Sequence, residues 1–197
     1  AIQTIPNSCI RGENGNCLFY LYLSWERLRD SKQKYSSGAV KPNHPWWGIG
    51  NVNAARFKNR LARTFVEEVL QPPAGTTLAG FKEIRYHEAG DKLVSFLEFL
   101  RDTFPNSKFI FLTRNLDQTV RSGWWALRPE EEVRSVLEKA EHRFRQFSRA
   151  NSQISYDITY QDMIDQSQVF WKMFEFLEGE PNVQQLSVAL SQQLMHG

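Results

Sequence analysis

A guanidinium and a hydroxyl eight residues apart form the first pair of side chains that could bind a phosphate. Arg114 ends the hydrophobic run KFIFLT at residues 108–113, and Ser122 follows it with Gly123 beside it. An arginine presents a planar fork of N–H donors that matches phosphate oxygens, and a serine hydroxyl adds one donor. The spacing alone is a weak motif, because an Arg114–Asp117 ion pair and an ordinary helical serine explain it equally well.

The elements that would position this pair alternate between strands and helices. Strands are predicted at 77–84, 108–113 and 153–159. Helices are predicted at 18–34, 52–70, 91–104, 115–127, 129–150, 161–178 and 182–194. This alternation indicates a parallel sheet in an α/β fold, in which ligands bind at the carboxyl ends of the strands. Three strands are few for such a sheet, so we expect a strand to be missing at its edge or its centre.

The composition is that of one globular domain. Of the 197 residues, 41% are hydrophobic and 23% are charged, and the formal charge is +2. This balance gives no argument for nucleic-acid binding, and no run of 18 apolar residues predicts a membrane span. Cys9 and Cys17 are too few for a disulfide scaffold and do not have metal-ligand spacing, so we expect free thiols and no metal.

The segment around Arg114 resembles part of a known enzyme family. FPNS followed by KFIFLTRNLDQTVRSGWW is similar to the 3′-phosphate-binding segment of sulfotransferases that use 3′-phosphoadenosine 5′-phosphosulfate (PAPS). Arg114 and Ser122 match the arginine and the serine of that segment, which implies that they hold the 3′-phosphate of the nucleotide. The resemblance also implies that family's fold, a P-loop-NTPase-like parallel sheet flanked by helices.

Further segments in the same order extend the resemblance over most of the chain. GFKEIRY resembles the family strand whose lysine, here Lys82, lies near the transferred sulfuryl group. ISYDITYQDMIDQ, followed by WKMFEFLEGEP, resembles the segment whose tyrosine, here Tyr160, approaches the adenine. Apart from the resemblance, Lys82 is equally a strand-end lysine that pairs with Glu83 or Glu88.

The resemblance also assigns a general base. IRGENGN is similar to a segment of tyrosylprotein and bacterial carbohydrate or lipid sulfotransferases, and the carboxylate of that segment, here Glu13, is the base in some members. A carboxylate there accepts the proton of an acceptor hydroxyl as its oxygen attacks sulfur. The plainer alternative is a solvated or helix-capping glutamate. His87 is the rival base, but Ile84 occupies the position of the catalytic histidine found in many family members, so we expect a surface or supporting role for His87.

One segment of the family is not seen. The family places a strand and a turn of the RSGTT or KSGTT type before these segments, and that turn holds the 5′-phosphosulfate. The nearest stretches, SSGA at 36–39 and GIGN at 48–51, follow no predicted strand, and residues 1–8 read as the end of a helix. We therefore expect a single domain over 1–197 without its first strand, phosphate loop and part of its first helix, and weak or no activity for this chain alone.

Two pairs of adjacent tryptophans stand out among the aromatic residues. Trp124 and Trp125 cannot both face the core from one helix, so we expect one of them to be exposed. Trp46 and Trp47 belong to HPWWG in a long loop, and exposed aromatic residues on loops often contact ligands. HPWWG is therefore our candidate for contact with the acceptor.

Three functions fit these patterns. The first is sulfuryl transfer from PAPS, without a metal, to a hydroxyl or amine of a small-molecule, carbohydrate, lipid or peptide acceptor. The second is a P-loop-related small-molecule kinase, which needs a Walker lysine and a magnesium carboxylate that are not seen. The third is a non-catalytic, sulfotransferase-like binding module. The sequence determines neither the oligomeric state nor the cellular compartment. For a bacterial chain of this kind, the compartment would be the cytoplasm.

Overall fold

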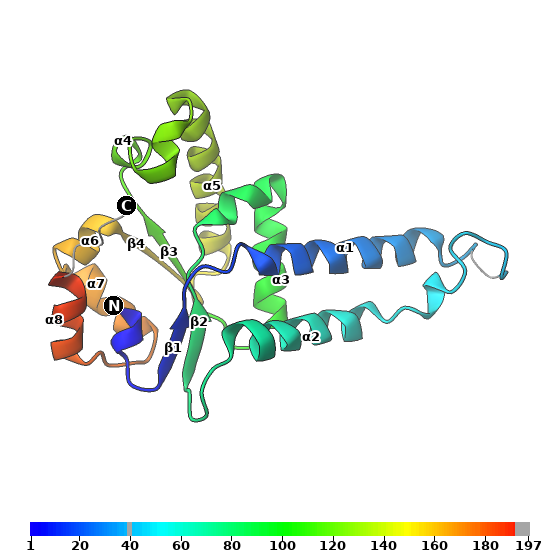
Figure 1. Ribbon diagram of the computed structural model, residues 1–197, viewed down its shortest axis with the longest axis horizontal. Helices are drawn as coiled ribbons and strands as arrows, with labels where there is room; N and C mark the ends of the chain where they lie inside the picture. Colours follow the sequence, from blue (N-terminus) through cyan, green and yellow to red (C-terminus); the bar gives the residue numbers. More distant parts are fainter. Residues whose placement is uncertain (39–40, 192–197) are drawn as a thin grey trace.

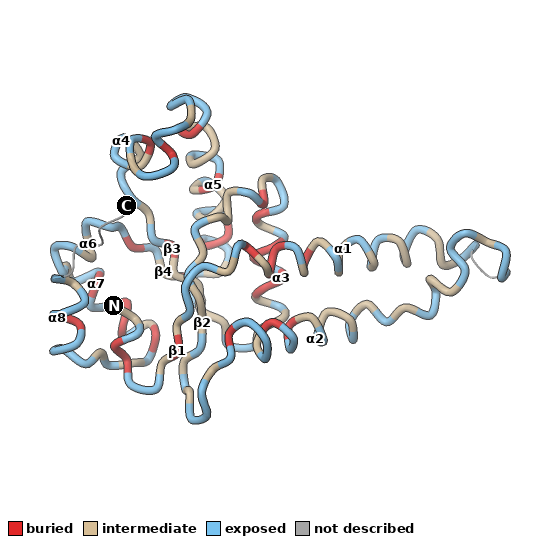
Figure 2. Tube along the Cα trace, in the orientation of Figure 1, coloured by how far each residue is buried: buried red, intermediate tan, exposed pale blue. Residues whose placement is uncertain are grey.

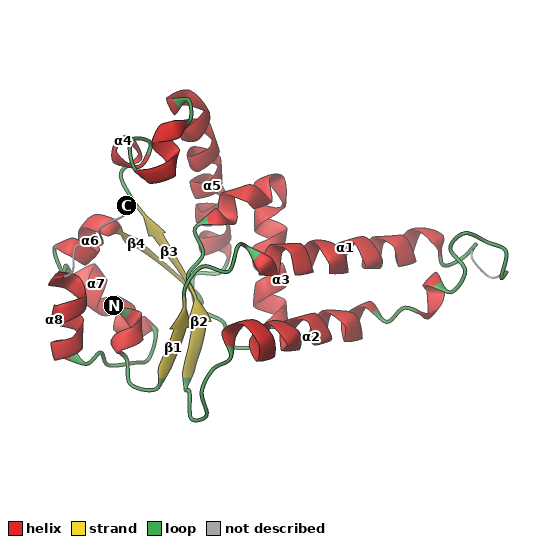
Figure 3. Ribbon diagram, viewed as in Figure 1, coloured by secondary structure: helices red, strands yellow, loops and turns green. Residues whose placement is uncertain are grey.

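The computed structural model describes residues 1–38 and 41–191 and shows an α/β protein in which helices predominate (Figure 1, Figure 3). Its described residues form the strands β1 (Ser8–Arg11), β2 (Leu78–Phe81), β3 (Phe109–Thr113) and β4 (Ser155–Thr159). β1 pairs with β2 and β3 with β4, and both pairs are parallel. The α/β class is therefore confirmed. Instead of one continuous sheet, however, the described residues form two sheets of two strands each.

Helices make up most of the chain, and most predicted helices are confirmed with ends that differ by a few residues. The helices and helical turns of the described residues are η1 (Ile2–Thr4), α1 (Cys17–Tyr35), η2 (Ile49–Asn51), α2 (Ala54–Thr64), η3 (Phe65–Leu70), η4 (Arg85–Lys92), α3 (Leu93–Thr103), α4 (Leu116–Thr119), η5 (Gly123–Leu127), α5 (Glu130–Ala150), α6 (Tyr160–Ile164), α7 (Gln168–Phe176) and α8 (Val183–Ser191). The end of the helix predicted at 182–194 lies outside the described residues. None of the described helices combines the length and the apolar character needed to cross a bilayer.

Strand β1 is an element that the sequence pattern does not reveal. Residues 1–8 do not continue a helix as expected, but form the short turn η1 and then enter β1. A strand of four residues between turn-forming segments is too short to display a two-residue period. Its partner defines it, because Ser8 to Arg11 lie in register with Leu78 to Phe81.

Two predicted helices are each interrupted. The segment 115–127 consists of α4 and η5, and Gly123, the first residue of η5, has a φ of 53°, which a regular helix does not allow. The segment 161–178 consists of α6 and α7, with Gln166 at a φ of 48° between them. Ser167 then caps α7 through its side chain. These breaks shorten the helices that follow β3 and β4, so residues near the strand ends lie in turns.

Two hydrophobic clusters hold the elements together. The larger cluster lies among α1, α3 and α5 and contains the fully buried rings of Tyr22, Phe96 and Phe147. The smaller cluster joins Ile5 and Ile158 to the buried faces of α7 and α8. Aromatic side chains fill much of the larger cluster, as the high phenylalanine content of the chain requires.

Both sheets contribute to both clusters. Leu78 of β2 and Ile110 of β3 pack against the smaller cluster, whereas Phe81 and Phe109 pack against the larger one. Side chains alternate between the two faces of a strand, so each sheet has one cluster on each face. The two sheets therefore lie between the same two clusters, although no ladder of hydrogen bonds joins them within the described residues.

Helices α1 and α2 project from this body as a two-helix arm (Figure 1). The outer part of the arm, residues 23–38 and 41–61, contains no buried residue (Figure 2). A polar contact joins the two helices here, because Trp25 donates its indole N–H to the Ala54 carbonyl at 3.1 Å. Because α1 has 19 residues, it is roughly 28 Å long, and its first turns lie in the larger cluster.

Candidate functional site

Arg114 and Tyr160 lie together where the paired strands β3 and β4 end. Arg114 follows β3 directly, and Tyr160 opens α6 directly after β4. Thr113 lies opposite Thr159 in the ladder, so the next residue of each strand emerges at the same edge. The guanidinium carbon of Arg114 lies 5.0 Å from the centre of the Tyr160 ring, within the range of cation–π attraction. The structure thus brings together two of the three residues assigned to the nucleotide.

No carboxylate neutralises Arg114 within the part of the chain that the structure describes. Its Nε donates a long hydrogen bond of 3.4 Å to the side-chain oxygen of Gln118. Asp117, the alternative partner suggested by the sequence, pairs with Arg134 at 2.6 Å. Arg114 is also exposed, so its charge is available to an anion from solution.

Ser122 lies at the junction of α4 and η5, whereas the sequence predicted a position two turns inside a helix. Its hydroxyl donates to the Thr119 carbonyl at 2.9 Å. No hydrogen bond joins Ser122 to Arg114 among the residues described. To bind a phosphate held by Arg114, the Ser122 hydroxyl has to rotate away from that carbonyl, which changes one torsion angle.

A second, charged cluster occupies the carboxyl ends of β1 and β2. Glu13 accepts a hydrogen bond from Lys82 Nζ at 3.1 Å and another from Arg85 Nη1 at 2.8 Å. Lys82 follows β2 directly, and Glu13 lies two residues beyond β1. The structure therefore brings the two predicted catalytic residues into contact. Within the described residues, neither Glu83 nor Glu88 pairs with Lys82.

The two cations set the ionisation of Glu13. Burial raises the pKa of its carboxyl, but hydrogen bonds and charge from Lys82 and Arg85 outweigh that effect, so the pKa lies below its ordinary value. Glu13 is therefore ionised at neutral pH and is a weaker base than an unpaired glutamate. Lys82 is largely exposed, so it can leave Glu13 without becoming a buried, unpaired charge.

Glu83 holds the loop that carries Glu13. Its side chain is 1% exposed. It accepts hydrogen bonds from four backbone N–H groups, those of Asn14 (3.3 Å), Asn16 (2.7 Å), Ile84 (2.9 Å) and Arg85 (3.0 Å). A buried carboxylate is tolerated where such donors satisfy it, and here the donors come from the loops after β1 and after β2. Sequence reasoning missed this role, since a lone glutamate beside a lysine forms no recognisable pattern.

The same loop turns the chain from β1 into α1. Asn14 Oδ1 accepts the Cys17 N–H at 2.9 Å, at the start of the helix. Asn16 is buried with a φ of 58° and donates its side-chain amide to the Arg85 carbonyl at 3.1 Å. Asparagine tolerates this left-handed conformation better than most residues. Glu13 is therefore held in a fixed turn.

His87 connects the charged cluster to the segment that contains Ser122. Its ring centre lies 4.9 Å from that of Trp125 and 5.8 Å from that of Trp124. Burial lowers the pKa of His87 below its ordinary value, so the ring is neutral at pH 7. Trp125 is 8% exposed and Trp124 is 41% exposed, which confirms that only one of the pair is buried.

The HPWWG segment lies at the far end of the arm. α1 begins four residues after Glu13 and runs 19 residues to Tyr35, whose ring stacks on Trp46. The length of the helix separates Trp46 from Glu13 by roughly 28 Å. HPWWG therefore cannot touch a small acceptor bound at Glu13, contrary to its predicted role, and can reach only an acceptor that extends along the arm.

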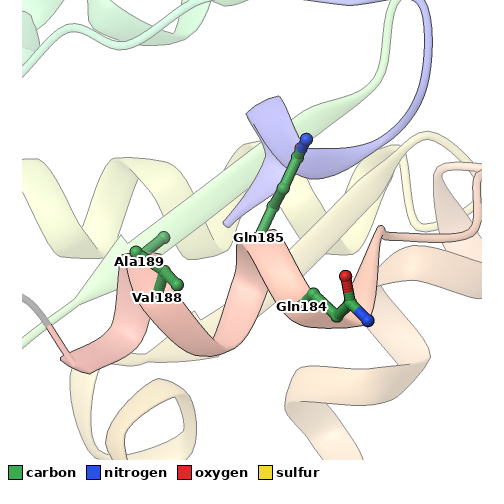
Figure 4. Close-up of a pocket in the computed structure, with 4 residues that line it drawn as sticks. All are labelled: Gln184, Gln185, Val188 and Ala189. Atoms are coloured by element: carbon green, nitrogen blue, oxygen red, sulfur yellow. The ribbon is translucent and has the colours of Figure 1, made fainter.

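Neither of two surface hollows contains a predicted site residue. One, of about 340 Å³, is lined by Gln184, Gln185, Val188 and Ala189 on α8 (Figure 4). The other, of about 310 Å³, is lined by Ser135, Glu138, Lys139, His142, Arg143 and Gln146 on α5. Within the described residues, no group of three His, Cys, Asp or Glu side chains is placed to bind a metal, and both cysteines are free.

Comparison with known proteins assigns no family to the chain. It matches no family model, and no curated protein or solved structure is significantly similar to it.

We expect Glu83→Gln to lower the free energy of unfolding by about 2–3 kcal/mol, because the amide replaces one acceptor oxygen and leaves buried N–H groups unsatisfied. Urea unfolding followed by circular dichroism measures this change. The exposed neighbour Glu88 provides the matched control, and Glu88→Gln should change the same free energy by less than about 0.5 kcal/mol. Equal losses in the two variants would contradict the role assigned to Glu83.

The ion pairs of Glu13 make a pH-dependent contribution to stability. The Glu13 pKa is lower in the folded than in the unfolded chain, so this contribution is present at neutral pH and is lost as the pH falls through the folded value. Because Lys82 is exposed to solvent, we expect Glu13→Gln to cost less than about 1 kcal/mol at pH 7 and less than that at pH 3. Urea unfolding at both pH values tests this, and a pH-independent difference would argue against it.

Proposed function

We propose that this protein is a sulfotransferase that transfers a sulfuryl group from PAPS to a hydroxyl or amine acceptor. The observation that carries the proposal is the exposed Arg114 guanidinium, which lies over the Tyr160 ring at the carboxyl ends of two parallel strands. A cation beside an aromatic face suits a nucleotide that carries both a phosphate and a base. The resemblance of the sequence to PAPS-dependent sulfotransferases supports the same two residues.

The nucleotide would bind across the ends of β3 and β4. Arg114 and Ser122 would hold the 3′-phosphate, Arg114 with charge-assisted hydrogen bonds and Ser122 with its hydroxyl. Tyr160 is partly exposed, so its ring can stack on the adenine beside the guanidinium. The contact between His87 and Trp125 would hold the end of β2 against the segment that follows Ser122.

Glu13 and Lys82 would carry out the transfer. A bound donor would draw Lys82 away from Glu13 to the sulfuryl oxygens, where its charge stabilises the negative charge that develops in the transition state. Loss of one cation makes Glu13 a stronger base, and it accepts the proton of the acceptor hydroxyl as that oxygen attacks sulfur. The bond between sulfur and the bridging phosphate oxygen breaks, and adenosine 3′,5′-bisphosphate leaves.

The proposal includes the P-loop-like fold and requires a phosphate loop for the 5′-phosphosulfate. GIGN at 48–51 does not provide one, because it forms the cap and body of η2 at the far end of the arm. SSGA at 36–39 follows α1 and extends beyond the described residues. Each of the four strands has one edge without a ladder partner in the described part of the chain, so a further strand that carries such a loop has an edge to pair with.

We expect Arg114→Ala to weaken the binding of adenosine 3′,5′-bisphosphate by at least about tenfold, or roughly 1.4 kcal/mol, in isothermal titration calorimetry. The matched control is Arg121→Ala, because Arg121 is exposed and forms no ion pair among the described residues. Tyr160→Phe should bind as tightly as the wild type, since the stacking ring is kept. Unchanged affinity in Arg114→Ala, or equal weakening in Arg121→Ala, would refute the nucleotide site.

Lys82→Ala should lower the rate of sulfuryl transfer by about 10²–10³-fold, because it removes a charge that stabilises the transition state. The assay uses labelled PAPS with a panel of hydroxyl and amine acceptors, and Lys172→Ala is the control for an exposed lysine. Nucleotide binding without transfer to any acceptor would favour the non-catalytic module. Magnesium-dependent ATP turnover would favour a kinase.

A further inference from the structure

The α1–α2 arm concentrates the positive charge of the protein. Residues 24–63 contain nine Lys or Arg and two Asp or Glu, a formal charge of +7, whereas the whole chain carries +2. The rest of the chain therefore has a formal charge of −5. The exposed cations of the arm are Arg27, Arg29, Lys34, Lys41, Arg56, Arg60 and Arg63.

Few of these charges are neutralised within the protein. Among the described residues, Arg29 and Arg63 are the arm cations that form ion pairs, and each does so with a carboxylate on its own helical segment. Glu26, one of the two arm carboxylates, pairs instead with Lys92 outside the arm at 2.6 Å. The remaining arm cations face solvent or donate to neutral groups, so the arm attracts anions strongly.

The unpaired cations follow regular rows on the two helices. Arg27 and Lys34 are seven residues apart on α1 and share one face, and Arg56 and Arg60 are four apart on α2 and share another. Like charges four residues apart, as at Arg56 and Arg60, repel one another and destabilise the helix that carries them. An anionic partner would relieve this repulsion along the outer arm, where the helices have no buried residue to stabilise them.

The far end of the arm, residues 41–49, carries exposed tryptophans. Trp46 stacks on Tyr35 with ring centres 4.2 Å apart and planes 7° apart, and Trp47 is 54% exposed. Lys34 Nζ lies 5.1 Å from the centre of the Tyr35 ring, and Lys41 is exposed. The tip thus combines flat aromatic surfaces with adjacent cations, and it projects away from the body (Figure 1).

We propose that the tip of the α1–α2 arm docks on an anionic lipid surface. Tryptophan rings favour the boundary between lipid and water, and lysine and arginine side chains are attracted to anionic headgroups within about 10 Å. A flat surface meets the tip before it meets the body of the protein. Cations alone would suit a soluble polyanion equally well, whereas the exposed Trp46 and Trp47, in the segment that joins the two helices, favour lipid. This docking does not depend on the proposed transferase function.

Co-sedimentation with two kinds of vesicle tests the docking. We expect the protein to bind vesicles of phosphatidylcholine with phosphatidylserine in low salt, to dissociate in high salt, and not to bind vesicles of phosphatidylcholine alone. Trp47→Ser should weaken binding by at least about tenfold, and so should Lys34→Gln combined with Lys41→Gln. Circular dichroism establishes that each variant remains folded.

Matched controls test whether the effect belongs to the tip. Trp171→Ser removes a partly exposed tryptophan from α7, and Lys139→Gln combined with Lys172→Gln removes two exposed lysines outside the arm. Both controls should bind the anionic vesicles within about twofold of the wild type. Failure of the wild type to bind, or equal losses in the controls, would overturn the proposal. Wild-type binding by Trp47→Ser together with loss in the lysine variant would overturn the role given to the tryptophan, because the contact would then be purely electrostatic.

Discussion

The buried carboxylate of Glu83 is the interaction on which the charged cluster depends. It accepts hydrogen bonds from backbone N–H groups of the loop after β1 and of the loop after β2. It therefore holds together two loops that are far apart in sequence. Lys82 is positioned by the register of β2, and Glu13 by the loop that Glu83 holds. The ion pair between Glu13 and Lys82 follows from this arrangement. A pair of exposed charges contributes too little by itself to order a loop.

Arg114 and Tyr160 are positioned differently, and unlike the charged cluster they leave a cation unneutralised. Arg114 and Tyr160 need no buried residue such as Glu83 to position them, because the parallel register of β3 and β4 places the residue after each strand at one edge. Glu13 is neutralised by two cations, whereas Arg114 has only the Tyr160 ring and a long hydrogen bond to Gln118. Arg114 at the end of β3 can therefore bind an anion directly. Near the end of β1, Lys82 must first leave Glu13 before it can bind one.

The sequence pattern was informative where elements are long or rich in β-forming residues. It predicted β3, β4 and α5, whereas the contact of Arg114 with Tyr160 depends on the pairing of β3 with β4, which the sequence pattern did not specify. It did not reveal β1, whose four residues are a strand because β2 lies beside them. Nor did it show the break at Gly123, where the φ is 53°, since the surrounding residues are compatible with a helix. The role of Glu83 depends on backbone groups from distant loops, which no local pattern encodes.

The opposite charges of the arm and the body would orient the protein on an anionic surface. An anionic surface attracts the arm, with its formal charge of +7, and repels the body, whose formal charge is −5. Each force acts only on the part of the protein that lies within about 10 Å of the surface, so encounters through the arm are favoured over encounters through the body. Glu13 lies near the base of the arm, beyond the reach of surface charge at physiological ionic strength. Docking at the tip and chemistry at the strand ends are therefore electrostatically independent, and a change in one should leave the other intact.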